Sequence, residues 1–168
     1  MKIRPASIAD VPRMMEIERQ AATAAHWTEQ SYIDAIAQTQ PRRVVLVLEV
    51  SDSDPFVQST GGSTPEVLAF SVVHCFESEW EIENIAVDLA FRRRGFASHL
   101  LQVILQQARL EGGTHIRLEV RESNVAARKL YKRWGFRQSG RRRKYYRDPD
   151  EDALILEIFF DRVTSEIS

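Results

Sequence analysis

The stretch from residue 82 to residue 97 constrains the fold of this chain more than any other. It begins with an apolar, strand-like run, 82–87, which leads into an arginine-rich turn containing Gly95. A helical pattern of apolar residues follows at once, at Leu100, Leu101, Ile104, Leu105 and Ala108. A strand, a glycine turn and a helix N-terminus together form an anion site, because unpaired backbone N–H groups and the helix dipole converge there. The stretch therefore predicts a strand–turn–helix unit that holds an anionic group.

The spacing of the turn, Arg92-x-x-Gly95-x-Ala97, differs from both common phosphate-binding patterns. It lacks the Gly-Lys-Ser/Thr ending of a P-loop and the three glycines of a dinucleotide site. It resembles the Gln/Arg-x-x-Gly-x-Gly/Ala loop with which acetyltransferases of the GNAT superfamily hold the pyrophosphate of acetyl-CoA. A basic turn before an ordinary helix is the alternative interpretation, because arginine and glycine are common in surface turns.

A second block, residues 118–136, resembles the other signature of that superfamily in its bacterial Rim-type form. It reads Leu-Glu-Val-Arg-Glu-Ser-Asn-Val-Ala-Ala-Arg-Lys-Leu-Tyr-Lys-Arg-Trp-Gly-Phe. The Asn-Ile-Ala-Val-Asp of 84–88 belongs to the same pattern, and 142–153 resembles the substrate-side tail of the subgroup. The resemblance covers nearly the whole chain. On these residues the chain is identified as a member of the GNAT superfamily, of Rim type.

This resemblance implies one acetyltransferase domain over residues 1–168, with an α/β (α+β) fold of the GNAT type. Its sheet is mixed, mostly antiparallel and splayed, with about seven strands flanked by about four helices. Acetyl-CoA is expected to lie between the fourth and fifth strands. A chain of 168 residues has the length of one domain and can bury a core of its own.

The pattern of apolar residues independently supports an α/β domain. One helix is predicted to begin at Asp10, its N-cap, and a second at Thr28. Two more helices are predicted over 95–111 and 123–134. The last of these should be capped by Ser123 and buried along Ala127, Leu130 and Trp134. Strands are predicted at 2–4, 44–50, 67–74, about 80–88, 114–121, about 137–147 and about 152–160. The Ser-, Gly- and Pro-rich segment 51–65 has no periodicity and is predicted to be a loop.

The composition is that of an ordinary globular protein, with 43% hydrophobic and 28% charged residues. The longest apolar runs, such as 44–48, are far too short to cross a bilayer, and residues 1–5 form no apolar signal region. We therefore expect no membrane span and no secretion. The single cysteine, Cys75, permits no internal disulfide, which fits a reducing cytoplasm, and it is expected in a strand core.

Two classes of ligand are disfavoured by the residues. The four histidines are scattered and no His/Cys cluster has metal-ligand spacing, so no metal is expected. A net charge of −1 argues against nucleic acid as the main ligand, since nucleic-acid-binding domains are usually strongly basic. The basic runs at 92–94 and 141–144 are interpreted as a phosphate clamp and as a strand with solvated charges.

Acetyl transfer from a thioester to an amine needs a base for the amine, a donor for the oxyanion and a proton for the leaving thiolate. Apolar residues alternate from 116 to 120, which places Glu119 on the opposite face of its predicted strand, between two arginines. A surface ion pair is the alternative interpretation. The resemblance implies instead that Glu119 is the general base, with Glu83 on the preceding strand as a second candidate.

Tyr131 is the candidate general acid. A phenol has a pKa near 10, so it stays protonated at neutral pH and can give its proton to a leaving thiolate. The resemblance implies this role, whereas an aromatic residue packing on the sheet is the alternative. Asn124, at the start of the same helix, is expected to bind the cofactor arm or to orient the site, with local capping as the alternative.

The resemblance also implies which residues hold acetyl-CoA, the acetyl donor. The backbone of Ile85, Ala86 and Val87 should pair with the pantetheine amides like an added strand. The pyrophosphate should be held by the turn and the first helical residues, through backbone N–H groups and arginine side chains: Arg92, Arg93, Arg94, Gly95, Phe96, Ala97 and Ser98. The chain has alanine at 97, where glycine is usual in the family, and leucine at 89, where proline is frequent. Neither change is expected to prevent the close approach of the cofactor to the backbone.

For the acceptor, the Rim-type resemblance implies the N-terminal α-amine of a protein, of the ribosomal-protein alanine type. An α-amine has a pKa near 8 and lysine one near 10.4, so deprotonation costs roughly 3–4 kcal/mol less for the α-amine. Recognition is expected between the turn at 26–28, which comprises His26, Trp27 and Thr28, and the hairpin with Tyr145 and Tyr146. Glu83 is also expected to bind the acceptor. The acidic stretch 148–152 could attract a basic tail, or could be a solvated turn.

Two alternatives to this function remain open at the level of sequence. One is an acetyltransferase for a small-molecule amine, such as a polyamine or a drug. The other is a non-catalytic acetyl-CoA-binding module, against which Glu119 and Tyr131 argue. No membrane and no nucleic acid are expected as partners.

Overall fold

The computed structural model describes residues 1–168 apart from 22–26, 39, 52–65, 148 and 161–168. Its elements, in chain order, are β1 (Lys2–Pro5), the 3-10 turn η1 (Ile8–Asp10), α1 (Val11–Arg19), α2 (Glu29–Ala37), β2 (Arg43–Val50), β3 (Glu66–Phe76), β4 (Glu79–Val87), the 3-10 turn η2 (Leu89–Phe91), α3 (Phe96–Leu110), β5 (His115–Arg121), α4 (Val125–Arg133), β6 (Arg137–Tyr146) and β7 (Glu151–Phe159). The predicted strands and helices are confirmed, with ends that shift by a few residues.

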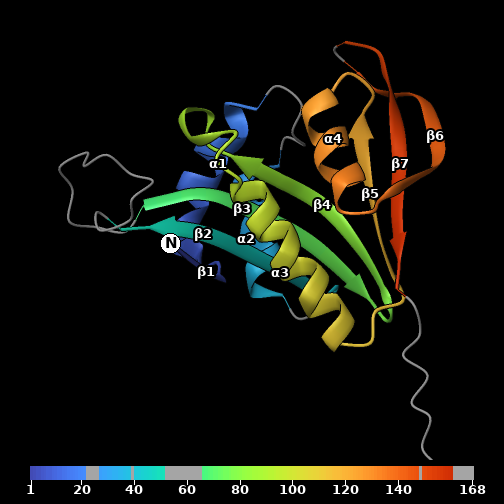
Figure 1. Ribbon diagram of the computed structural model, residues 1–168. Coiled ribbons are helices and arrows are strands. Elements are labelled where there is room, and N and C mark those ends of the chain that lie inside the picture. The colour runs from blue at the N-terminus through green and yellow to red at the C-terminus, as the bar shows by residue number, and fades with distance from the viewer. Residues whose placement is uncertain (22–26, 39, 52–65, 148, 161–168) are drawn as a thin grey trace, which may run out of the picture.

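The strands form one seven-stranded sheet in the order β1-β2-β3-β4-β5-β7-β6. The β4–β5 pair is parallel and every other pair is antiparallel. The ladder between β4 and β5 runs only from Glu79↔His115 to Ile82↔Leu118. Beyond that point the two strands diverge, which opens a V at the upper end of the sheet in Figure 1. The splayed sheet predicted from the resemblance is confirmed.

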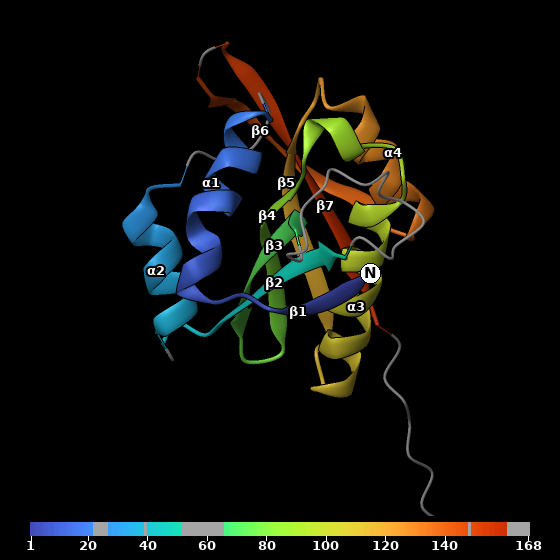
Figure 2. The same ribbon diagram turned by 90° about the vertical axis from the view of Figure 1, so that its left-hand side faces the viewer.

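Helices cover both faces of the sheet and seal a hydrophobic core on each. Figure 2 shows α1 and α2 on one side of the strands and α3 and α4 on the other. The α3 side is packed by fully buried leucines and isoleucine at 100, 101 and 104, and the α1–α2 side by Met14, Ile17 and Phe70. Burying one such side chain contributes about 1.5–3 kcal/mol, so these apolar stripes hold the helices on the sheet. The turn between β4 and α3 is thereby placed at the open end of the V.

A bulge in β4 changes which way its side chains face. Val72 of β3 pairs with Asn84, but Val73 pairs with Ile82, so Glu83 is an extra residue in the ladder. An inserted residue reverses the alternation of faces beyond it. Ile82 consequently packs in the α3-side core, whereas Asn84 contacts α1 and α2.

The capping of two helices differs in part from the prediction. Asp10 occupies the N-cap position of α1, as predicted, but its side chain makes no capping bond to that helix. Its carboxylate instead accepts at 2.7 Å from the N–H of Ser7, the N-cap of the preceding 3-10 turn. Asn124, not Ser123, caps α4 through a 3.1 Å bond from Ala127 N–H. The Ser123 N–H instead donates to the carboxylate of Glu151. In both places the expected capping residue hydrogen-bonds to a group outside its helix instead, and the local sequence pattern does not reveal that partner.

The predicted stripe of α4 is only partly buried. Ala127, Leu130 and Trp134 pack against the core but stay half-exposed, and Tyr131 is the buried residue of the helix. The reason is the position of α4 beside the diverging ends of β4 and β5, where Ala127 faces a cavity rather than packed side chains. The predicted loop over 51–65 lies outside the described residues except at its first position. Within the described residues, no helix is both long and apolar enough to span a membrane.

Candidate active site

A cavity of about 120 Å³ lies where β4 and β5 separate. It brings together six of the predicted site residues from distant parts of the sequence: Glu83, Ile85, Glu119, Asn124, Tyr131 and Tyr146. Asn84, which lies between two of them in β4, also lines it. Ala21, Ile82, Val120, Arg121 and Ala127 complete its lining. The side chains come from β4, β5, α4 and β6, which only the splayed sheet places around one space.

Tyr131 reaches the cavity from α4. Its side chain is buried, and its ring contacts Phe136 edge-on at 5.5 Å between centroids. Its hydroxyl makes no hydrogen bond to any described residue, so it is available to a ligand in the cavity. Burial raises the pKa of Tyr131 above the usual phenol value, and the nearby Tyr146 adds to the rise. A phenol held in this way is a proton donor over the whole neutral range.

Glu119 reaches the cavity from β5. The predicted alternation is confirmed, since residues 116, 118 and 120 are buried and Glu119 lies on the opposite face. Its carboxylate accepts a bond from Arg142 Nε at 3.0 Å and also hydrogen-bonds with Tyr145. The bond to Glu119 is the first cause of a raised pKa for Tyr145, with burial second. Glu119 is thus a hydrogen-bond acceptor held between β6 and the cavity.

Glu83 lies at the bulge of β4 and is tied to β2. Arg43 donates to its two carboxylate oxygens at 2.7 and 3.0 Å, a paired geometry that matches guanidinium to carboxylate. The same guanidinium lies 5.7 Å from the centre of the Trp27 ring. Trp27 in turn contacts the ring of Tyr32, 5.4 Å away. The predicted acceptor residues Trp27 and Glu83 are therefore linked through Arg43.

The tip of the β6–β7 hairpin closes the other side of the cavity. Tyr145 and Tyr146 contact each other edge-on at 5.1 Å, and Tyr146 lines the cavity. Arg121 lies 4.2 Å from the centre of the Tyr146 ring. Burial, followed by the charge of Glu119, raises the pKa of Tyr146 to about 12. Both tyrosines therefore stay uncharged at neutral pH.

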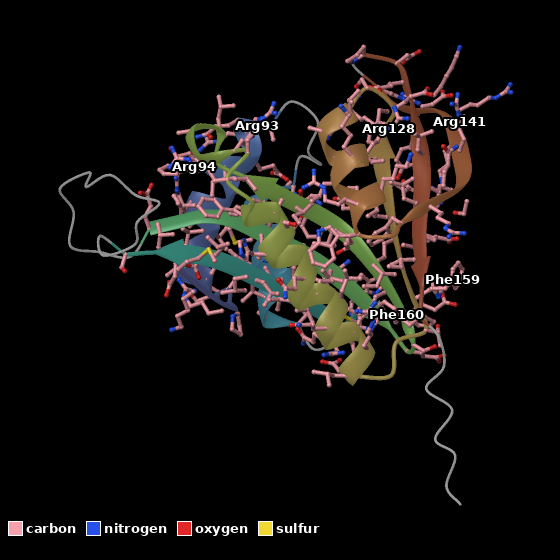
Figure 3. All side chains as sticks on the ribbon, viewed as in Figure 1. Arg93, Arg94, Arg128, Arg141, Phe159 and Phe160 are labelled. Atoms are coloured by element: carbon pink, nitrogen blue, oxygen red, sulfur yellow. The ribbon has the colours of Figure 1, made fainter. Side chains whose placement is uncertain are left out.

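The predicted anion turn has the geometry that its sequence requires. Gly95 adopts φ +89°, a left-handed conformation that favours glycine, and is the N-cap of α3. The first N–H groups of any α-helix lack acceptors in the preceding turn, which makes a helix N-terminus suited to an anion. Arg92 closes the turn by donating to the carbonyls of Val87 and Gln20. Figure 3 shows Arg93 and Arg94 standing on this turn, at the end of the molecule opposite Phe159 and Phe160.

Hydrogen bonds from Arg13 of α1 also stabilise the turn. Arg13 donates to the carboxylate of Asp88 at 2.7 Å and to the carbonyl of Val67 at 3.0 Å. The Asp88 carboxylate accepts from Ala90 N–H and so caps η2. These bonds attach the end of β4 and the start of the turn to a helix on the far face of the sheet, and they were not predicted.

A buried polar network that the sequence analysis missed lies beneath the cavity. Glu18 of α1 is 2% exposed, and its carboxylate accepts from Asn84 Nδ2 at 2.7 Å, from the Tyr32 hydroxyl at 2.8 Å and from Trp27 N–H at 3.1 Å. The signal was present in the sequence, because Glu18 falls on the apolar stripe of its helix, four residues after Met14. A carboxylate on such a stripe indicates buried partners. This network ties the Trp27 segment to the strand that lines the cavity.

Replacing Glu18 by alanine is expected to destabilise the fold by about 3–5 kcal/mol. The change would leave two buried donors and one partly buried donor without their acceptor, and each unpaired buried polar group is costly. Urea unfolding followed by circular dichroism measures the loss. Glu16→Ala is the matched control on the same helix, since Glu16 is half-exposed and forms an ion pair with Arg13, and it should cost less than about 1 kcal/mol. Equal losses for the two variants would contradict the structural role of Glu18.

The acidic stretch after β6 is engaged within the hairpin. Asp152 accepts from Lys144 N–H at 2.8 Å and from Arg141 at 3.2 Å, and Glu151 accepts from Arg121 and from Ser123 N–H. These bonds lower the pKa of both carboxyls. At 151–152 these hydrogen bonds within the protein favour the interpretation of the stretch as a turn over its interpretation as a binding site for a basic tail. Residue 148, like His26 of the predicted Trp27 turn, lies outside the described residues.

Among the described residues, no group of three or more His, Cys, Asp or Glu side chains is placed to hold a metal ion. Cys75 is buried in β3, and burial raises the pKa of its thiol to about 11. A thiol with so high a pKa is a poor nucleophile at neutral pH. The titratable side chains that line the cavity are two carboxylates, two phenols and the guanidinium of Arg121.

Comparison with known proteins places these features in a family. A profile of the Acetyltransferase (GNAT) family matches residues 12–136. The ribosomal protein bS18-alanine N-acetyltransferase of Haemophilus ducreyi is 31% identical over 153 residues, which cover 89% of this chain and 94% of that protein. The protein of the same name from Escherichia coli K12 is 32% identical over 151 residues, covering 89% and 90%.

Solved structures agree with the sequence relatives. The crystal structure of the ribosomal-protein-S18-alanine N-acetyltransferase from Escherichia coli has a TM-score of 0.77 at 26% identity, covering 99% of this chain and 98% of that one. NAA60 of Arabidopsis thaliana, solved in complex with acetyl-CoA, has a TM-score of 0.78 at 20% identity, covering 95% and 98%. The second likeness concerns the fold alone.

Proposed function

Since this chain belongs to the GNAT acetyltransferase family and is an acetyl-CoA-dependent N-acetyltransferase of Rim type, we propose that its acceptor is the N-terminal α-amine of a protein. We further propose that Glu119 is the general base and Tyr131 the general acid. The observation that carries this proposal is that the two side chains, from β5 and α4, line the same cavity between the diverging strands.

The reaction follows from the groups around the cavity. The amine nitrogen bonds to the thioester carbonyl carbon, and the resulting tetrahedral centre loses its carbon–sulfur bond. Glu119 accepts the proton that leaves the nitrogen, and the departing sulfur receives the proton of the Tyr131 hydroxyl. The raised pKa of Tyr131 supports this assignment, because it keeps the donor protonated until the thiolate forms.

The donor is held by the elements that the sequence motif predicted. The edge of β4 beyond Ile82 has no ladder to β5, so Ile85, Ala86 and Val87 present backbone groups toward the gap. The left-handed Gly95 and the N-terminus of α3 lie at the open end of that gap and would hold the pyrophosphate. Asn124 uses its side-chain oxygen to cap α4, and its position in the cavity lining supports a second role toward the donor arm.

The acceptor assignment rests on the relatives and on acid–base chemistry. The relatives are named for acetylation of the alanine of ribosomal protein bS18. An α-amine is far more often uncharged at neutral pH than a lysine side chain. The acceptor would enter on the face of the sheet covered by α1 and α2, hereafter the acceptor side, between Trp27 and the tyrosines at 145 and 146. A ribosomal protein with a small first residue is the proposed partner.

A substrate panel tests this assignment. The protein is incubated with acetyl-CoA and with alanine-initiated peptides, lysine peptides whose N-terminus is blocked, and polyamines, while free thiol is followed. Alanine-initiated peptides should give the highest kcat/KM. A polyamine that is acetylated more efficiently than any of these peptides would assign a small-molecule amine as the acceptor. No thiol release with any amine would favour a binding module.

Glu119→Gln is expected to lower kcat/KM for an alanine-initiated peptide on the order of 100-fold, by a similar factor from pH 6 to pH 9. The uncharged amide cannot accept the proton that the nitrogen loses once it has bonded to the carbonyl carbon. Steady-state rates from pH 6 to pH 9 measure the effect. Glu122→Gln is the matched control, since Glu122 lies just beyond the same strand and pairs with Arg141 outside the cavity. An unchanged kcat/KM in Glu119→Gln would make Glu119 a structural acceptor for Arg142 rather than a base.

A further inference from the structure

Both carboxylates at the acceptor side of the cavity already hold an arginine. Glu83 is paired with Arg43 of β2, and Glu119 with Arg142 of β6. The two carboxylates are only 21% and 12% exposed, so water screens their charges poorly. Each negative charge that faces an incoming amine is thus compensated by the protein itself before substrate binds.

Aromatic rings hold both arginines in place. The guanidinium carbon of Arg43 lies 5.7 Å from the centre of the Trp27 ring, and that of Arg142 lies 5.2 Å from the centre of the Tyr145 ring. A cation over an aromatic face is attracted to it, which restricts the guanidinium together with the ion pair. The same two aromatic residues are the proposed walls of the acceptor site. A substrate ammonium would therefore be repelled by the two arginines at the place where it would need an unpaired carboxylate.

We propose that Arg43 and Arg142 are specificity-determining residues that reserve the acceptor site for an uncharged amine. The inference deepens the proposed function and rests on it, because it explains how a protein α-amine is preferred over a lysine side chain or a polyamine. At pH 7 about 10% of an α-amine is uncharged but only about 0.04% of a lysine amine, a difference of more than 100-fold. A free buried carboxylate would attract the ammonium and offset that difference.

The proton balance of the reaction agrees with entry of the free amine. The lone pair of the uncharged nitrogen attacks the carbonyl carbon, so the nitrogen becomes acidic only after the bond forms. Glu119 then accepts this one proton, and the sulfur takes the proton of Tyr131 as the carbon–sulfur bond breaks. Both side chains regain their resting protonation by exchange with solvent. A carboxylate that is hydrogen-bonded to Arg142 can accept this proton, because the nitrogen loses it readily once the bond to carbon has formed.

The test compares amine preference in arginine variants. Arg43→Gln and Arg142→Gln are assayed with an alanine-initiated peptide, with the same peptide carrying a blocked N-terminus and one lysine, and with spermidine. We expect the preference for the α-amine, as a ratio of kcat/KM values, to fall about tenfold or more. The fall should come from a lower KM for the lysine peptide and for spermidine. Arg43→Lys and Arg142→Lys keep the positive charge and should keep most of the preference.

Arg117→Gln is the matched control. Arg117 lies on β5 on the same face as Glu119, but it pairs with Glu81 at 3.3 Å, and neither residue lines the cavity. Removing this arginine should leave the preference unchanged. Melting temperatures and acetyl-CoA affinities measured by calorimetry identify variants that are folded. An unchanged preference in folded Arg43→Gln and Arg142→Gln would overturn the inference.

The pH profile of the wild type provides a test that needs no variant. Glu119 faces Tyr145, Tyr146 and the arginines at 121 and 142. The two tyrosines stay uncharged between pH 7 and pH 9, since the pKa of Tyr145 is raised and that of Tyr146 is about 12. If only the uncharged amine enters, kcat/KM for the lysine peptide rises about tenfold per pH unit in this range. A flat profile would overturn the inference while leaving the acceptor assignment intact. A wild type that prefers lysine or spermidine would instead overturn the proposed function.

Discussion

Tyr131→Phe should lower kcat on the order of 100-fold while leaving the affinity for acetyl-CoA and the melting temperature nearly unchanged. Loss of a general acid typically reduces the rate by 10²–10⁴-fold, because the leaving group must depart without a proton. The Tyr131 hydroxyl bonds to no described residue, so its removal breaks no hydrogen bond of the fold. Release of free thiol measures kcat, and calorimetry measures donor binding.

The alkaline limb of the wild-type profile provides the control. Burial, with Tyr146 as the second cause, raises the pKa of Tyr131, and a raised pKa keeps the acid form present to higher pH. The kcat of the wild type should therefore not decline on the alkaline side up to about pH 10, the usual phenol value. A decline between pH 8 and pH 9 that persists in Tyr131→Phe would assign the proton donor to another group.

Gly95→Asp should weaken acetyl-CoA binding by at least about 100-fold. The substitution adds a negative charge at the N-cap of α3, where the donor's pyrophosphate is proposed to lie. Like charges a few ångströms apart at a partly screened site repel by several kcal/mol, and each 1.4 kcal/mol is a tenfold change in affinity. Isothermal titration calorimetry with acetyl-CoA gives the dissociation constants.

Two further variants separate charge from backbone strain. Gly95→Ala imposes the same strain at φ +89° without a charge, so it should lose much less affinity than Gly95→Asp. Gly112→Asp introduces the same side chain at φ +78° beyond the opposite end of α3, with no atom within 4 Å of its Cβ, and should bind acetyl-CoA normally. Tight binding by Gly95→Asp would place the pyrophosphate elsewhere.

The strand–turn–helix unit at 82–97 was predictable because its signals are local. Glycine at 95 marks the left-handed turn, and the apolar spacing that begins at Leu100 marks the buried face of the following helix. Both depend on backbone sterics and periodicity, which act between residues close in sequence. For the same reason, the alternation around Glu119 predicted its face of β5 correctly.

The local signals failed where a distant segment supplied the partner. Ser123 has the residue type of a helix cap, but its N–H donates to Glu151, 28 positions away at the start of β7, and Asn124 caps the helix instead. Asp10 likewise has an arginine partner in β1 at 2.8 Å and serves the turn before α1. Capping residues compete for the same donors, and tertiary contacts decide that competition.

The sequence by itself determined the family, the element order and the identity of the chemical groups, because motifs and periodicities are written in neighbouring residues. Only the tertiary structure decided how those groups are paired. The bulge at Glu83 turns Asn84 toward Glu18, and the packing of β2 and β6 beside the cavity brings Arg43 and Arg142 onto its two carboxylates. Such ion pairs join residues 23 to 40 positions apart, and no local pattern encodes them, because their energy exists only once the sheet has formed.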